Sequence, residues 1–93
     1  MNKEALKEKL LKEGFVNVYE WHDEPGVEYR SHSHKGAVAF YILEGSVSFR
    51  FRDKEVELKS GNRIDVPVGE EHSARVGSDG CTFLVGEMIE GDS

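Results

Sequence analysis

The chain has 93 residues, of which 38% are hydrophobic and 10% aromatic. That is enough apolar material for one small domain with its own core, and it leaves no room for a second domain. The formal net charge of −6 argues against nucleic acid as a partner, because binding to phosphates needs a basic face. We therefore expect a single domain over residues 1–93 that does not bind nucleic acid.

Signals for targeting or cross-linking are few. The first residues, MNKEALKEKLLKEG, are charged throughout and lack the apolar core of a secretion signal. No apolar run is long enough to cross a bilayer. The single cysteine, Cys81, cannot form an internal disulfide. These features predict a soluble, cytoplasmic protein without a membrane partner.

The first segment, residues 1–14, is expected to be helical. Ala5, Leu6, Leu10 and Leu11 recur at helical spacing over residues 2–13. Gly14 then stands where a glycine in a left-handed conformation commonly ends a helix. The pattern predicts one short amphipathic helix, which would pack either on the rest of the domain or on a second subunit.

From residue 15 to residue 89 the hydrophobic period changes to two. In SVSFRF, for example, Val47, Phe49 and Phe51 share one face and alternate with polar residues. Turn signals such as Pro25-Gly26 separate the apolar segments. Short strands at this regular spacing are typical of a sandwich or barrel. We expect eight of them, near residues 15–22, 27–34, 37–43, 46–52, 55–59, 63–67, 72–77 and 81–88.

Two histidines stand out in the stretch YRSHSHKG. His32 and His34 are two residues apart, so on a strand their side chains point to the same side, about 6.6 Å apart. With metal–nitrogen bonds of about 2.1 Å, two such imidazoles can close on one ion. A third ligand is suggested by His72, which directly follows the tight turn at Gly69.

The spacing of these residues resembles the two signature motifs of the cupins. The resemblance to the first motif rests on Gly26, then His32 after five intervening residues, His34 after one more, and later Gly45. The resemblance to the second motif rests on Gly61, then Pro67 after five intervening residues, Gly69 after one more, and His72 after two more. The stretch between them, residues 46–60, is as short as in small microbial cupins. Together the motifs and the hairpin between them cover about half of the chain.

The resemblance implies an all-β jelly-roll barrel of about eight strands with one short N-terminal helix. It also implies one divalent transition metal inside the barrel, held by His32, His34 and His72. The family usually supplies a glutamate after three or four intervening residues beyond the second histidine, but this chain has Val38 and Ala39 at those positions. Where the second motif often ends on asparagine, this chain has Val76. The expected site is therefore three neutral imidazoles with open coordination positions, and Zn, Fe, Ni, Mn and Cu are not distinguished.

Other residues are candidates for a pocket around this site. Strand alternation puts Arg30 on the same face as the two histidines, where it could bind a carboxylate or, as we favour, pair with an acid such as Glu28. The apolar wall is expected to include Val38, Phe40, Ile42, Phe51 and Phe83. His22 could be a fourth ligand, although a lone histidine is more often an edge residue. Proton transfer would fall to a histidine, to Tyr29, to Tyr41 or to water, and no catalytic residue is assigned.

Three classes of function follow from an open three-histidine site. The first is a metalloenzyme acting on a small molecule, such as the dioxygenases among all-histidine cupins. The second is a binding or sensor module for a small molecule, and the third is a barrel whose metal is purely structural. Jelly-roll edges and the N-terminal helix also lead us to expect a homodimer, as the family resemblance implies.

Overall fold

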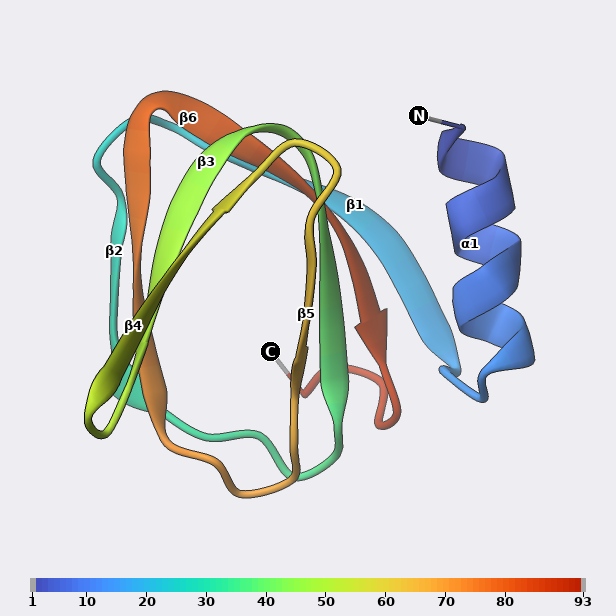
Figure 1. The fold of residues 1–93 in the computed structure, drawn as a ribbon. Helices are drawn as coiled ribbons and strands as arrows, with labels where there is room; N and C mark the ends of the chain where they lie inside the picture. The colour runs from blue at the N-terminus through green and yellow to red at the C-terminus, as the bar shows by residue number, and fades with distance from the viewer. Residues whose placement is uncertain (1, 93) are drawn as a thin grey trace.

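A computed structural model describes residues 2–92 of the chain. One helix precedes six antiparallel strands (Figure 1). The elements are α1 (Lys3–Lys12), β1 (Asn17–Asp23), β2 (Glu28–His32), β3 (Val38–Phe51), β4 (Lys54–Lys59), β5 (Arg63–Val66) and β6 (His72–Glu87). The all-β class expected from the alternating pattern is confirmed, and α1 is the one helix among the described residues.

Two long strands, β3 and β6, run through both layers of the barrel (Figure 1). The first half of β3 and the second half of β6 lie between β1 and β5, while their other halves lie between β2 and β4. The structure therefore has six strands where the sequence predicted eight. Predicted strands 37–43 and 46–52 are continuous in β3, and 72–77 and 81–88 are continuous in β6.

The strands bend without breaking because glycines occupy the corners. Gly45 in β3 has φ 81° and Gly80 in β6 has φ 75°, a region that residues with a Cβ rarely adopt. The pairing of β3 with β6 shifts register on each side of Glu44 and Gly45 but then resumes. The turn chemistry in the sequence therefore marks corners of single strands at these two places.

The core is divided between the barrel interior and the underside of the helix. The interior cluster includes Val38, Ile42 and Phe83, which are buried as predicted, with Phe40 and Phe51 partly buried against it. A second cluster joins Leu10 of α1 to Phe15 and Leu84 on the outer side of the sheet. Gly14 has φ 105° and ends the helix as expected. Of the two placements considered, α1 packs on its own sheet.

The described residues contain no helix long and apolar enough to cross a membrane. The only helix among them, α1, has 10 residues, whereas a spanning helix needs about 20.

Candidate metal centre

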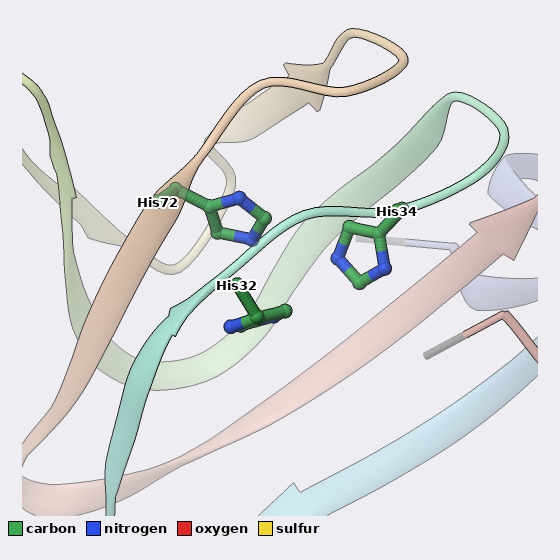
Figure 2. A group of neighbouring side chains, drawn as sticks. All are labelled: His32, His34 and His72. Carbon is green, nitrogen blue, oxygen red and sulfur yellow. The ribbon is translucent and has the colours of Figure 1, made fainter.

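Three histidines converge at one end of the barrel. His32 ends β2, His34 follows two residues later, and His72 begins β6 directly opposite His32 in the strand pairing. One ring nitrogen of each lies within 4.8 Å of those of the other two. Their ring centroids are 4.4–5.1 Å apart, and Figure 2 shows the rings gathered around one point. The geometry brings together all three residues predicted as ligands.

The backbone fixes the tautomer of each imidazole. Nδ1 of His32 lies 2.7 Å from the carbonyl oxygen of Arg30, and Nδ1 of His72 lies 3.0 Å from that of Glu70. The same nitrogen of His34 lies 3.2 Å from the carbonyl oxygen of Asp92. A carbonyl oxygen can only accept, so each Nδ1 carries the proton and donates it. Each Nε2 therefore keeps a free lone pair. In metal-binding histidines, the nitrogen that does not bind the metal usually donates to a carbonyl or carboxylate in the same way.

A buried atom without a partner supports a metal at this point. His34 and His72 are buried, and Nε2 of His34 has no hydrogen-bond partner. A buried polar atom left unpaired costs about 1–3 kcal/mol, and a metal ion would satisfy it. Burial, followed by the nearby His32 and His34, lowers the pKa of His72, which favours the neutral form that binds metal. The residues present therefore fit a divalent transition metal.

No carboxylate belongs to this cluster among the described residues. Val38 and Val76, which occupy the motif positions of the family's glutamate and asparagine, are both buried in the interior apolar cluster. The donor set consists of three neutral imidazoles, so a bound dication would keep its full charge and have positions open to other ligands.

The histidines border a cavity of about 490 Å³ that occupies the barrel interior. Most of its wall is apolar, and Phe40 and Phe83 belong to it as expected of pocket residues. Val38 and Phe51 are not among the lining side chains, although the Phe51 ring lies 6.0 Å from that of His72. The lining residues are Asn17, Tyr19, Trp21, Asp23, Tyr29, His32, His34, Phe40, Val47, Phe49, His72, Ala74, Phe83, Val85, Glu87 and Gly91.

An irregularity in β2 decides which residue faces this cavity. The pairing of β2 with β6 shifts register between Tyr29 and His32, so the alternation of inward and outward side chains is interrupted there. As a result Tyr29 lines the cavity together with His32, while exposed Arg30 borders a hollow on the outer face. Glu28 lies on the same outer face and pairs with Arg75 at 3.1 Å.

Asp23 and its partners form a polar group that the sequence reading missed. The Asp23 carboxylate is 8% exposed and accepts hydrogen bonds from Nε1 of Trp21 at 3.0 Å and from the hydroxyl of Tyr29 at 2.7 Å. Burial, and then this bond to Asp23, raises the pKa of Tyr29 to about 12. The strand expected near residues 15–22 stopped short of Asp23, and Tyr29 belongs to another strand, so the sequence pattern did not bring these side chains together.

Glu87 forms a second polar group in the cavity wall, and it was also missed. Its carboxyl oxygens lie 2.9 Å from Nδ2 of Asn17, 2.8 Å from the hydroxyl of Tyr19 and 3.2 Å from the backbone nitrogen of Gly91. Glu87 is fully buried, at the end of β6. The only indication in the sequence was that Glu87 is a charged residue directly after an apolar strand segment.

Two other candidates lie outside the cavity. His22 faces away from it and contacts Thr82 at 2.9 Å and Glu24 at 3.0 Å, so it is not part of the histidine cluster. Tyr41 is buried in the cluster beneath the helix, and the guanidinium of Arg63 lies 5.0 Å from the centre of its ring. Of the two tyrosines considered for proton transfer, only Tyr29 lines the cavity.

Comparison with known proteins decides the family. Residues 19–85, which hold all three histidines and all six strands in full or in large part, match the model of the cupin domain. The chain belongs to the cupin family. No curated protein was found to match this cupin by sequence.

Solved structures agree with this assignment. A cupin-2 domain protein from Shewanella frigidimarina is 25% identical, with a TM-score of 0.67 over 75% of this chain and 67% of that one. The polyketide cyclase RemF from Streptomyces resistomycificus is 28% identical, with a TM-score of 0.66 over 77% of this cupin and 54% of the cyclase. The DMSP lyase DddQ from Ruegeria pomeroyi is 21% identical, with a TM-score of 0.74 over 86% and 41% of the two chains. The likeness to DddQ is one of fold alone.

Proposed function

We propose that this cupin is a metalloenzyme that holds one divalent transition metal on His32, His34 and His72 and acts on a small organic molecule in the barrel cavity. The observation that carries the proposal is the placement of the three histidines. Their free Nε2 atoms converge in the wall of a cavity of about 490 Å³, a volume within the range of small-molecule sites.

The metal and the protein would have separate tasks. A metal with open positions supplies a Lewis acid or a site for dioxygen. The chain supplies the enclosure: Phe40, Phe49 and Phe83 form an apolar wall that keeps water away from a bound molecule. Tyr29, whose pKa is raised to about 12, holds its proton and donates it in a hydrogen bond to Asp23, so it does not act as a base. The dioxygenase class considered from the sequence is one specific form of this proposal.

Similarity to an enzyme supports catalysis as the first choice. RemF, which is 28% identical to this cupin over 77% of the present chain, is named as a polyketide cyclase. The fold is therefore used by an enzyme whose name describes chemistry on an organic molecule. The substrate of the present cupin does not follow from that name, because fold and function are separable.

A binding or sensor module is the second candidate, and one observation favours it. Both carboxyl groups in the cavity already accept hydrogen bonds from neighbouring side chains. A cavity whose acids are occupied in this way offers no unengaged base, which suits binding better than proton abstraction. The open donor set argues against a third possibility, a metal that is only structural, because structural sites are usually closed.

The test is elemental analysis of protein purified without tag or chelator. We expect about one metal per chain in the wild-type protein and a large loss in His34→Ala and His72→Ala. The matched control is His22→Ala, which removes an imidazole that lies outside the cluster and should leave the metal content unchanged.

Two outcomes would contradict the proposal. Absence of metal from the wild-type protein, even after incubation with each candidate ion, would remove the metal site and leave the binding module. Loss of metal in His22→Ala alone would mean that the ligand set is wrong. If metal is present, its identity directs the activity screen, with dioxygen uptake tested first for iron.

We also propose, from the family resemblance and composition, that the protein is a cytoplasmic homodimer. The exposed apolar side chain of Val16, just before the edge strand β1, is compatible with pairing. Light scattering on the eluted protein would give the mass, and a monomer at all concentrations would exclude the dimer.

A further inference from the structure

Asp23 places a negative charge in the cavity wall that no cation among the described residues neutralises. Asp23 lines it and is 8% exposed, yet within residues 2–92 no basic side chain forms an ion pair with it. Across the same residues no lysine or arginine lines the cavity. Its partners are neutral donors, the indole of Trp21 and the hydroxyl of Tyr29. Buried charges are normally paired, so this one calls for a cation from outside the chain.

The surroundings of Asp23 suit an organic cation. Trp21 and Tyr29 line the cavity and remain partly exposed, with 52% and 38% of their surfaces open to solvent. They therefore stand where the cavity meets solvent. Aromatic faces attract ammonium groups through cation–π interactions, and a carboxylate has room for more donors than the two it has here. Aromatic rings and an acid together favour a charged nitrogen on an apolar body.

The carboxylate and the histidines lie toward different ends of the cavity. Asp23 ends β1, a short turn leads into β2, and His32 stands at the far end of β2 (Figure 1). Asp23 pairs with Cys81 of β6, whereas His32 pairs with His72, nine residues earlier in the same strand. A molecule that reaches both ends must be elongated, with different chemistry at each end.

We propose that the ligand of this cavity is a small elongated molecule with a positively charged nitrogen at the Asp23 end and a metal-binding group, such as a carboxylate, at the histidine end. The metal-binding end rests on the proposed function, whereas the cationic end does not. The geometry assigns Asp23 as the group that selects for the cation, with Trp21 and Tyr29 enclosing it.

Four probes of similar length separate these contributions. Hexylamine has only the cation, hexanol is its neutral counterpart, hexanoate has only the anion, and aminohexanoate has both. Binding of each is measured by calorimetry and by NMR shifts of Trp21, in metal-free and in metal-loaded protein. We expect hexylamine to bind the metal-free protein about tenfold more tightly than hexanol, the effect of one hydrogen-bonded charge pair. In metal-loaded protein aminohexanoate should be the tightest of the four.

Variants assign the preference to one carboxylate. Asp23→Asn should reduce the ratio of hexylamine affinity to hexanol affinity to about one, because the amide keeps the shape of the carboxylate and loses its charge. The matched control is Glu20→Gln, which removes an exposed carboxylate of the same strand from the outer face and should leave the preference unchanged. If Asp23→Asn does not fold, Trp21→Leu keeps the charge and should still weaken hexylamine more than hexanol.

Different results would contradict different parts of the proposal. Equal binding of hexylamine and hexanol, tighter binding of hexanoate to metal-free protein, or no binding of hexylamine to the wild-type protein would each overturn the cationic end. Loss of the preference in Glu20→Gln would assign it to general surface charge and overturn the role of Asp23. Metal content is measured on the same samples, so a protein without metal that still prefers hexylamine would refute the proposed function and leave the cationic end intact.

Discussion

Asp92 is the residue through which the end of the described chain reaches the candidate metal centre. Its backbone carbonyl accepts from Nδ1 of His34 at 3.2 Å, and its carboxylate accepts from the backbone nitrogens of Lys35 and Gly36 at 2.9 and 2.8 Å. These two backbone bonds, the first of them the larger effect, lower the pKa of Asp92. The side chain thus holds the carbonyl that orients the His34 imidazole.

Asp92→Ala should therefore weaken metal binding without removing a ligand. We expect the metal dissociation constant to rise about 10- to 100-fold, the usual effect of losing an outer partner. Asp92→Asn keeps an oxygen acceptor and should recover part of the affinity. Asp79→Ala removes an exposed acid of β6 that lies seven residues after His72, about 23 Å along the strand, and should have no effect. Unchanged affinity in Asp92→Ala, measured by competition with a chelating dye, would show that His34 needs no such support.

Tyr29 should lose its proton only at unusually high pH. Its pKa is raised from 10.0 to about 12, first by burial and then by its bond to Asp23. A raised pKa means that the folded state holds the proton more tightly, so this stabilisation is complete below pH 10 and is lost as the pH rises to about 12. The tyrosinate absorbance of wild-type protein minus that of Tyr29→Phe should rise near pH 12. A midpoint near 10 would mean that the phenol is solvated and free of Asp23.

At the scale of elements, the corners of β3 and β6 decide how the barrel closes. Gly45 stands where β3 passes from one layer to the other, opposite Cys81 of β6. A Cβ added to Gly45 would collide with the carbonyl oxygen of Gly80. The two paired strands can approach this closely at the corner only because Gly45 and Gly80 have no side chains.

Gly45→Ala should be strongly destabilising. The left-handed conformation at φ 81° costs a residue with a Cβ about 1–2 kcal/mol, and the collision adds about 1–3 kcal/mol of overpacking. Gly69→Ala is the matched control, because Gly69 also has a positive φ of 75° but an added Cβ meets nothing within 4 Å. Urea unfolding should show the larger loss in Gly45→Ala. Equal losses would mean that backbone conformation alone matters at the corner.

At the scale of the molecule, the candidate centre ties separate parts of the chain together. His32 and His34 lie on or just after β2, His72 begins β6, and Asp92 near the end of the described chain contacts His34. A ligand that bound these histidines only in the folded state would stabilise the whole barrel, because unfolding would have to release it.

Metal should accordingly raise the melting temperature. With free metal at about 100 times its dissociation constant, the free energy of unfolding rises by about 2.7 kcal/mol. For a domain of this size that corresponds to about 10–20 °C in Tm. Calorimetry before and after a chelator measures the shift, and His34→Ala should melt at one temperature in both conditions. A shift of the same size in His34→Ala would place the stabilising metal elsewhere.

The all-β class, the single helix and the three converging histidines could all be predicted from the sequence. Each of these depends on local information: hydrophobic period, a glycine after a helix, and two motifs whose spacing is a property of the chain. The buried positions of Val38, Ile42 and Phe83 followed from the same alternation. Periodicity reports which face of a segment is apolar, and that is enough for these features.

Which faces meet could not be predicted in this way and followed from the tertiary structure. It joined eight predicted strands into six, because glycine corners let hydrogen-bonded pairing continue through a bend. An irregularity in β2 brought Tyr29 to the cavity and left Arg30 outside. Asp23 and Glu87 entered the cavity wall through pairings of strands distant in sequence. Such contacts depend on register and on chain closure, which a one-dimensional pattern does not contain.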